Sequence, residues 1–247
     1  MKGIILAGGT GSRLAPLTKV TNKHLLPVGK YPMIFHPIAK LKEAGIRDIL
    51  IVTGKDHMGD VVNLLGSGSE FDLTFTYKVQ DRAGGIAEAL GLAENFVNGD
   101  RMVVILGDNV FADSIVPYTR SFRDQGEGAK VLIQEVPDPQ RYGVPELRGD
   151  RIVSIDEKPQ APKSGYAVTG IYMYDSRVFE IIKTLKPSGR GELEITDVNN
   201  TYIEAGQLSY DILPGWWTDA GTHASLMRAN ELAKEIDLGE AFGKFKS

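Results

Sequence analysis

Three glycines and an arginine lie together near the start of the chain, in Gly8-Gly9-Thr10-Gly11-Ser12-Arg13. Glycines let backbone N–H groups approach phosphate oxygens closely, and an arginine side chain can hold a phosphate through two parallel hydrogen bonds. The surrounding stretch is basic, because seven Lys or Arg residues and no Asp or Glu precede Glu43. The segment therefore predicts a loop that binds an anion, and phosphate in particular.

Two common phosphate-binding motifs do not fit this loop. A dinucleotide-binding fingerprint would need a glycine where Leu14 stands and an acidic residue about 20 positions later, which the acid-free stretch excludes. A P-loop would need G-x-x-x-x-G-K-[S/T], which the chain does not contain. A plain strand-to-helix turn would explain one or two glycines, but not three together with an arginine.

An aspartate is the first candidate for holding a metal ion. Asp108 follows the apolar run Met102–Leu106, so a strand there would place its carboxylate at the edge of a sheet. Mg²⁺ binds through one or two carboxylates together with phosphate oxygens, which suits a phosphate-binding loop nearby. Taken alone, a Gly-Asp-Asn sequence would more simply be a turn.

The elements that must position these residues alternate along the chain. Short β-branched runs alternate with segments of helical spacing, a pattern typical of parallel β-α-β units. We predict strands at Lys2–Ala7, Asp48–Thr53, Leu73–Lys78, Met102–Leu106, Lys130–Val136, Arg151–Ile155 and Ala167–Tyr174. We predict helices at Met33–Ala44, Met58–Leu65, Ile86–Phe96, Ser114–Asp124, Ser176–Leu185, Ile195–Ala205 and His223–Glu235. In such α/β sheets the ligand crevice lies at the carboxyl ends of the strands, where the glycine loop and Asp108 fall.

The length and composition are those of an ordinary folded protein. The chain has 247 residues, 42% hydrophobic and 24% charged, with a net charge of −4, so we expect one α/β domain and no nucleic-acid partner. It has no cysteine, which excludes disulfides, thiol nucleophiles and Cys-ligated metals and suits a reducing compartment. The apolar start is too short for a signal peptide, and no stretch approaches a membrane span, so we expect a cytoplasmic protein without a membrane partner.

Several motifs resemble those of the sugar-1-phosphate nucleotidylyltransferase family, in the order in which the family has them. They are Gly8-Gly9-Thr10-Gly11-Ser12-Arg13-Leu14, Pro16-Leu17-Thr18, Lys23 with Leu25-Leu26-Pro27-Val28, Leu106-Gly107-Asp108-Asn109, Tyr142-Gly143-Val144, Glu157-Lys158-Pro159, Gly189–Asn199 and Asp219-Ala220-Gly221-Thr222-His223. The resemblance covers nearly the whole chain. The block Glu192-Leu193-Glu194-Ile195-Thr196-Asp197-Val198-Asn199 is similar to that of the thymidylyl branch of the family.

The resemblance implies a fold and a reaction. The expected fold is the three-layer α/β/α, Rossmann-like nucleotide-diphospho-sugar transferase fold with a mixed, mostly parallel sheet. It would form a single domain over 1–247, with a nucleotide-binding part at 1–125 and a sugar-binding part at 126–247. The implied reaction joins dTTP to α-D-glucose 1-phosphate, releases pyrophosphate and requires Mg²⁺.

The resemblance also implies a role for each site residue. Asp108 and Asp219 would hold the metal, while Arg13, Lys23 and Lys158 would be the catalytic cations that hold the phosphates. The remaining substrate-binding residues would be Leu6, Gly8, Gly9, Gly11, Ser12, Gln80, Gly85, Tyr142, Gly143, Glu157, Val168 and Gly170. Of these, Gln80 and Gly85 would read the pyrimidine edge, and Glu157 would accept hydrogen bonds from the sugar.

Three departures from the thymidylyl pattern leave alternatives open. His24 and Glu88 stand where many relatives have Gln, and Thr218-Asp219-Ala220 replaces Leu-Asp-Thr. His24 could add a pH-dependent contact beside the phosphate loop. UTP or another sugar 1-phosphate in the same pocket, or a nucleotide-sugar-binding subunit without activity, are the alternatives.

Chain length gives one further expectation. Longer family members continue with C-terminal helices that form an effector site between subunits. Because little chain follows His223, we expect a monomer or small homo-oligomer without that site.

Overall fold

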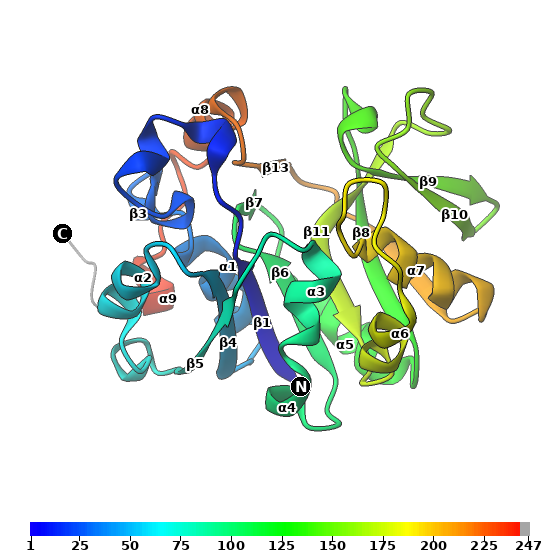
Figure 1. The fold of residues 1–247 in the computed structure, drawn as a ribbon, viewed down its shortest axis with the longest axis horizontal. Coiled ribbons are helices and arrows are strands. Elements are labelled where there is room, and N and C mark those ends of the chain that lie inside the picture. The colour runs from blue at the N-terminus through cyan, green and yellow to red at the C-terminus, as the bar shows by residue number, and fades with distance from the viewer. Residues whose placement is uncertain (243–247) are drawn as a thin grey trace.

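A mixed β-sheet runs through both halves of the computed structural model, which describes residues 1–242 (Figure 1). The last five residues of the predicted domain lie outside the described residues. The main sheet contains β1 (Lys2–Ala7), β4 (Asp48–Gly54), β5 (Thr74–Gln80), β6 (Met102–Leu106), β8 (Ala129–Glu135), β9 (Gly143–Arg148), β10 (Arg151–Glu157), β11 (Tyr166–Tyr174) and β12 (Leu208–Ile212). Two small ribbons pair β2 (Pro27–Val28) with β3 (Tyr31–Pro32), and β7 (Asn109–Phe111) with β13 (Trp217–Asp219).

The strand order places the carboxyl ends of β1 and β6 at the middle of the sheet. Strands β5, β4, β1 and β6 lie side by side and parallel, as the β-α-β pattern predicts. Strand β11 then runs antiparallel between β6 and β8, and β12 adds to β8 in parallel. The β9–β10 hairpin joins the end of β11 through the pair Val168 and Gly143. The predicted mixed, mostly parallel sheet is therefore confirmed.

Helices cover both faces of the sheet, which gives the predicted three layers (Figure 1). They are α1 (Phe35–Glu43), α2 (Met58–Leu65), α3 (Ile86–Gly91), α4 (Glu94–Val97), α5 (Val116–Asp124), α6 (Val178–Thr184), α7 (Ile195–Glu204), α8 (His223–Leu232) and α9 (Gly239–Phe242). Among them, α1, α2, α5 and α9 contribute to one apolar cluster, and α3, α4, α6 and α7 to the other.

Strand β1 shows why this layering follows from its sequence. Its side chains alternate in direction, so Ile5 and Ala7 enter the cluster on one face while Ile4 and Leu6 enter the cluster on the other. All four are buried. A central parallel strand is buried on both faces and therefore reads as a continuous apolar run, as this one does.

One helix prediction was wrong. A single helix was expected over Ile86–Phe96, but α3 ends at Gly91 and α4 begins at Glu94. The backbone tightens between them, because Leu92 and Ala93 donate to carbonyls three residues back rather than four. Gly91 is a poor helix former at the point of the break.

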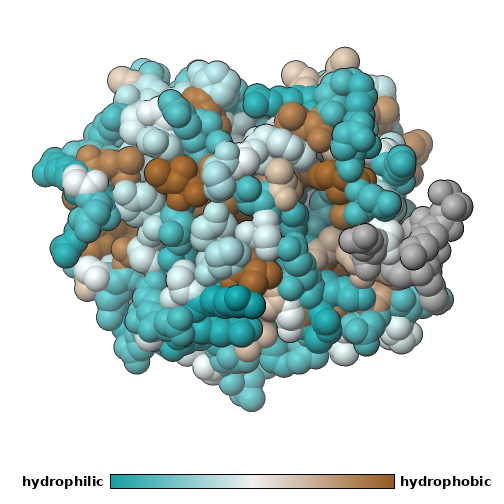
Figure 2. Space-filling model, turned by 180° about the vertical axis from the view of Figure 1, so that it is seen from behind, coloured by the Kyte–Doolittle hydropathy of each residue, from teal (hydrophilic) through white to brown (hydrophobic). Residues whose placement is uncertain are grey.

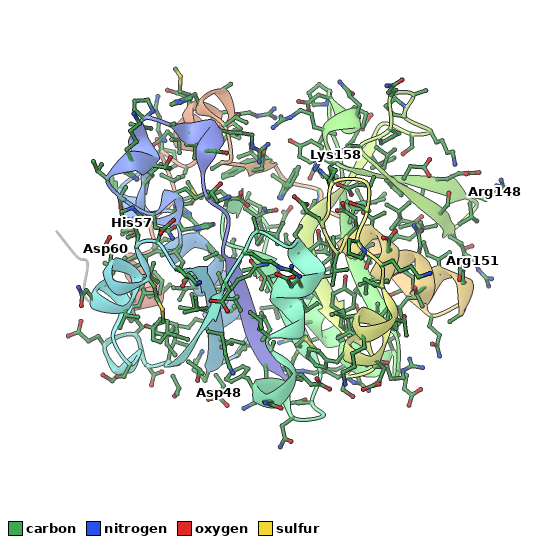
Figure 3. The ribbon with its side chains drawn as sticks, in the orientation of Figure 1. Asp48, His57, Asp60, Arg148, Arg151 and Lys158 are labelled. Atoms are coloured by element: carbon green, nitrogen blue, oxygen red, sulfur yellow. The ribbon has the colours of Figure 1, made fainter. Side chains whose placement is uncertain are left out.

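Basic side chains lie at both ends of the β9–β10 hairpin. Arg148 and Arg151 lie at the outer end of the β9–β10 hairpin, whereas Lys158 lies at the opposite end, nearer the middle of the molecule (Figure 3). The opposite face of the molecule is mostly hydrophilic, with hydrophobic patches scattered across it (Figure 2). No helix described between residues 1 and 242 is long and apolar enough to cross a membrane.

Candidate active site

The glycine loop turns sharply as it leaves β1. Gly11 has a φ of 64°, in the left-handed region, and its carbonyl oxygen accepts hydrogen bonds from the backbone N–H of Leu14 and the hydroxyl of Thr18. A β-carbon on Gly11 would lie 2.8 Å from the Thr18 side chain. Glycine is thus needed at this turn for both backbone conformation and space.

Lys23 and Asp108 form an ion pair where β1 and β6 end. The Lys23 Nζ lies 2.6 Å from a carboxylate oxygen of Asp108, and both side chains are mostly buried. Asn109 donates to the other oxygen at 3.1 Å. Burial alone would raise the pKa of the Asp108 carboxyl, but the Lys23 charge and these hydrogen bonds hold that pKa well below its usual range. Asp108 is therefore ionised at neutral pH.

The β7–β13 ribbon brings Asp219 to the same place. Its register pairs Asp219 with Asn109, and the N–H of Ala220 donates to the Asp108 carbonyl at 2.8 Å. The Asp219 carboxylate accepts hydrogen bonds from the Tyr142 hydroxyl at 3.0 Å and from Arg141 at 3.3 Å. Burial and the Asp219 charge raise the pKa of Tyr142 well above its usual range, so this hydroxyl remains a donor.

Gly221 leaves a space between the two aspartates. A β-carbon built on Gly221 would lie 3.3 Å from an oxygen of Asp108, 3.3 Å from an oxygen of Asp219 and 3.2 Å from a guanidinium nitrogen of Arg13. A cation in this space could touch both carboxylates. Within residues 1–242 no three His, Asp or Glu side chains gather as a metal-binding group. The pair therefore fits Mg²⁺, which takes its other ligands from phosphates and water.

A cavity of about 520 Å³ extends from this point over the glycine loop. We call it the nucleotide cavity. Its lining residues are Leu6, Gly8, Gly9, Arg13, Lys23, His24, Gln80, Ala83, Gly85, Ile86, Ala89, Leu106, Asp108, Lys158, Arg190 and Glu192. Lys23 and Arg13 provide this cavity with cations that can bind phosphate, and Gln80 and Gly85 also line it.

A second cavity, of about 380 Å³, lies on the other side of Asp108, and we call it the sugar cavity. Tyr142, Gly143, Val168, Gly170 and Asp219 line it together with a network around Glu157. One Glu157 oxygen accepts from the Thr196 hydroxyl at 2.6 Å, and the other lies 3.2 Å from Lys158 Nζ and from Arg190.

Lys158 lies at the border of both cavities. Its backbone is left-handed, with a φ of 46°, and its N–H donates to the Tyr142 carbonyl at 2.9 Å. A non-glycine residue in this region costs about 1 kcal/mol or more, and such conformations gather at functional sites. This turn thus belongs to the walls of both cavities, and Figure 3 shows Lys158 on the side of the β9–β10 hairpin that faces the middle of the molecule.

The structure brings most of the sequence-predicted residues together. Gly11 and Ser12 are the exceptions, because they form the turn of the loop and do not line either cavity. All the others line the nucleotide cavity, the sugar cavity or both. The individual roles assigned to these residues remain predictions.

Sequence reasoning missed residues that reach the site only through tertiary contacts. Arg190 and Thr196 belong to the family motif Gly189–Asn199, but the sequence alone gives them no role. Asn109 was not assigned either, although its side-chain oxygen accepts from the Gly170 N–H at 2.9 Å and from the Trp217 indole at 2.6 Å. Arg141 immediately precedes Tyr142, and its charge beside a predicted site residue was the available signal.

His24 does not act as a pH-dependent contact near neutrality. Burial, together with the nearby Lys23 charge, lowers its pKa to about 3. The Asn22 side-chain oxygen accepts from the His24 backbone N–H at 2.9 Å and lies 2.8 Å from its Nδ1. That oxygen can only accept, so Nδ1 carries the proton of a neutral ring. The expected pH-dependent contact was therefore wrong.

Comparison with known proteins identifies the class and then the family. Residues 2–235 match the model of the nucleotidyl transferase family, so the chain is a nucleotidyltransferase. A glucose-1-phosphate thymidylyltransferase of Neisseria meningitidis is 47% identical over 240 residues, which are 96% of this chain and 83% of that protein. The chain belongs to the family of glucose-1-phosphate thymidylyltransferases, as the sequence motifs predicted.

Solved structures agree with this assignment. The crystal structure of a candidate glucose-1-phosphate thymidylyltransferase from Bacillus anthracis, in complex with sucrose, is 66% identical with a TM-score of 0.95 and covers 98% of this chain and 99% of its own. A UDP-glucose pyrophosphorylase in complex with UDP-glucose is 25% identical with a TM-score of 0.84, covering 94% of this chain and 97% of its own. The predicted nucleotidyltransferase fold is confirmed.

Proposed function

We propose that this enzyme transfers a thymidylyl group from dTTP to α-D-glucose 1-phosphate, giving dTDP-glucose and pyrophosphate. The observation that carries the proposal is the junction of the two cavities at Arg13, Asp108 and Lys158. A nucleoside triphosphate in the nucleotide cavity and a sugar phosphate in the sugar cavity would bring their phosphates together there. Holding the two reacting phosphates close together and aligned contributes much of the rate enhancement in phosphoryl transfer.

The chemistry needs no general base. A phosphate monoester has a second pKa of about 6, so the sugar phosphate is mostly ionised at pH 7. One of its oxygens attacks the α-phosphorus, the bond to the bridging oxygen of the β-phosphate breaks, and pyrophosphate departs with that electron pair. The chain's task is therefore to align the phosphates and to neutralise their charge.

The cations divide this task between them. Arg13 and the glycine loop hold the departing phosphates, Lys23 the α-phosphate, and Lys158 the sugar phosphate. Asp108 and Asp219 would hold Mg²⁺, which as a Lewis acid would neutralise charge that develops on the phosphate oxygens. With an ion held by Asp108 and Asp219, Lys23 and Arg141 would no longer be needed as partners of these carboxylates and would be available to phosphate oxygens.

The nucleotide cavity would determine the choice of base, and the sugar cavity the choice of sugar. The Gln80 amide oxygen would accept from the N3–H of thymine, and the Glu157 carboxylate would accept from sugar hydroxyls. UTP remains an alternative substrate, because uracil offers the same N3–H. We also propose that the enzyme works in the cytoplasm as a monomer or small homo-oligomer, as a single domain whose residues 1–125 hold the nucleotide.

A pyrophosphate-release assay tests the substrates directly. Each of dTTP, UTP, CTP, ATP and GTP is supplied with glucose 1-phosphate, and dTTP is supplied with galactose, mannose and N-acetylglucosamine 1-phosphates. We expect dTTP to be preferred, with UTP weaker because loss of a methyl contact costs about 1–3 kcal/mol. Preference for CTP or a purine nucleotide would refute the thymidylyl assignment.

A further inference from the structure

A fixed amide lines the nucleotide cavity beside Gly8 of the glycine loop. Gln80, the last residue of β5, is only 8% exposed. Its Nε2 donates to the carbonyl oxygen of Gly85 at 3.2 Å and to a carboxylate oxygen of Glu88 at 3.2 Å. Because a carboxamide has two N–H donors, both are used inside the protein.

The amide oxygen points the other way. A β-carbon built on Gly8 would lie 2.7 Å from the Gln80 Oε1, and both residues line the nucleotide cavity. Among residues 1–242 no donor reaches this oxygen. A side chain that is almost fully buried thus presents an acceptor to a ligand in the cavity.

Glu88 determines this orientation. Its carboxylate can only accept, and Arg82 already donates two hydrogen bonds to its Oε2, at 3.1 and 2.9 Å, which leaves Oε1 for Gln80. If the Gln80 amide turned over, its oxygen would face two acceptors, on Gly85 and Glu88. A glutamine at position 88 would remove the charged one of these two acceptors, because its own amide could donate to the turned oxygen, and only the Gly85 carbonyl would still oppose the turn.

Gly84 allows this arrangement. A β-carbon at position 84 would lie 2.2 Å from the Glu88 carboxylate, so the carboxylate occupies the space that a side chain would fill. Glu88 is 21% exposed and Arg82 81% exposed. The carboxylate is thus packed against the α3 start, while the guanidinium reaches it from solvent.

We propose that Glu88 is a positioning residue for the choice of base, which it exerts by fixing Gln80 with its oxygen toward the cavity. This inference rests on the proposed function, which places the base at Gln80. Thymine and uracil present an N3–H that this oxygen can accept. Cytosine presents a lone pair at N3, which would face the oxygen of Gln80. Selection against cytosine therefore depends on Glu88, whereas the choice between thymine and uracil does not.

The test compares three nucleotides that differ only in the base. The kcat/KM values for dTTP, dUTP and dCTP with glucose 1-phosphate are measured by pyrophosphate release for the parent and for Glu88→Gln. We expect the dTTP-to-dCTP ratio to fall about tenfold or more in the variant. The dTTP-to-dUTP ratio should stay within about twofold, because both bases offer N3–H.

A matched control makes the same chemical change elsewhere. Glu94→Gln alters a surface glutamate of α4 that pairs with Lys183 outside the nucleotide cavity, and it should leave both ratios unchanged. If Glu88→Gln fails to fold, Glu88→Met keeps the side-chain length, removes the acceptor and carries the same expectation.

The outcomes separate the two proposals. Equal losses of kcat/KM for all three nucleotides in Glu88→Gln, with unchanged ratios, would show a merely structural role and overturn the inference. A parent enzyme that turns over dTTP under those conditions leaves the proposed function standing. A parent enzyme without turnover on dTTP would overturn the proposed function itself, whatever Glu88 does.

Discussion

Each of the two aspartates at the junction of the cavities is held by a cation before any ligand binds. Lys23 lies 2.6 Å from Asp108, and Arg141 lies 3.3 Å from Asp219. Unpaired carboxylates so close together would repel each other, so the ion pairs keep the ligand-free site stable. In the proposed reaction a divalent cation would replace these ion pairs, and Lys23 and Arg141 would then be available to the incoming phosphates. The same four side chains would thus serve both the ligand-free and the ligand-bound site.

Replacement of Asp108 tests this arrangement. Asp108→Asn keeps the side-chain shape and should keep the fold, but it should cost at least about 3 kcal/mol of transition-state stabilisation, or roughly a hundredfold in turnover. Asp219→Asn should behave alike. Turnover at saturating Mg²⁺ and melting temperature are measured together. A variant that melts like the parent and retains near-parental turnover would rule out the two-carboxylate assignment.

Gly221 provides a test of the metal position that leaves both carboxylates intact. Gly221→Ala would place a methyl group 3.3 Å from each of the two carboxylate oxygens. The φ of Gly221 lies outside the left-handed region, so alanine introduces no backbone strain there. We expect the Mg²⁺ concentration that gives half-maximal activity to rise, and kcat to fall at least about tenfold. The melting temperature should stay close to the parent's.

The control for that variant is a glycine that lines neither cavity. Gly59→Ala adds a methyl group in α2, where a β-carbon would meet no atom within 4 Å. It should leave the Mg²⁺ titration unchanged. If Gly221→Ala needs the same Mg²⁺ concentration as the parent for half-maximal activity, the ion does not bind between the two aspartates.

His24 predicts a pH dependence of stability. Its pKa is lowered to about 3 in the folded state, mainly by burial, whereas a histidine in the unfolded chain has its ordinary pKa of about 6.5. The unfolded state therefore binds more protons between these values. The stability contribution is complete above pH 6.5 and is lost as the pH falls toward 3. From this group alone we expect about 2 kcal/mol less stability at pH 5 than at pH 7.

Urea unfolding of the parent and of His24→Gln at both pH values measures this effect. Glutamine does not titrate, so the variant should lose about 2 kcal/mol less than the parent between pH 7 and pH 5. Equal losses in the two proteins would mean that His24 titrates normally.

At the scale of elements, the sequence predicts whatever depends on local pattern. Strands β1, β4 and β6 are continuous apolar runs buried on both faces, and their ends correctly locate the glycine loop and Asp108. The break between α3 and α4 and the pairing of β7 with β13 escaped prediction. The ribbon joins three-residue segments about a hundred positions apart, as in the contact of Asn109 with Trp217.

The same limit applies to the candidate site, where local pattern does not predict contacts between distant segments. Motif resemblance identified residues on both cavity walls, but it could not show which side chains orient others. The contacts of Glu88 with Gln80 and of Arg141 with Asp219 arise only when loops from separate elements meet. No periodicity within one segment encodes such contacts.

The start of α3 provides a test at the scale of an element. Gly85 has a φ of 101°, and a β-carbon on it would lie 2.4 Å from the Leu193 carbonyl oxygen. Leu193 ties the loop before α7 to this turn, because its N–H donates to Gly84 and its carbonyl accepts from Ala87. Gly85→Ala should cost about 1–3 kcal/mol and displace that loop, which carries Arg190.

Two measurements check the Gly85→Ala expectation. Urea unfolding should show the loss of stability, and the KM for glucose 1-phosphate should rise because Arg190 contacts the Glu157 carboxylate in the sugar cavity. Gly45→Ala is a useful comparison, since Gly45 also has a positive φ, of 74°, but no atom within 4 Å of its β-carbon position. If both variants lose the same stability and neither changes the KM, the contact with Leu193 has no role.

At the scale of the whole molecule, the two halves of the chain share one sheet and the apolar clusters on its faces. Strand β11, from the second half, lies between β6 and β8, and each large cluster contains side chains from both halves. Both cavities are likewise lined from both halves. Neither half can separate without exposing a large apolar surface, which disfavours partial unfolding.

We therefore expect one cooperative unfolding transition, with coincident curves by far-UV circular dichroism, which reports all helices and strands, and by fluorescence of Trp216 and Trp217 beside the site. Because dTTP with Mg²⁺ would bind only where the halves meet, it should stabilise the whole molecule, by about 2.7 kcal/mol at a hundred times its Kd. The entire transition should then move to higher urea. Two separate transitions, of which the nucleotide shifts only one, would show instead that the nucleotide-binding and sugar-binding parts fold as independent domains.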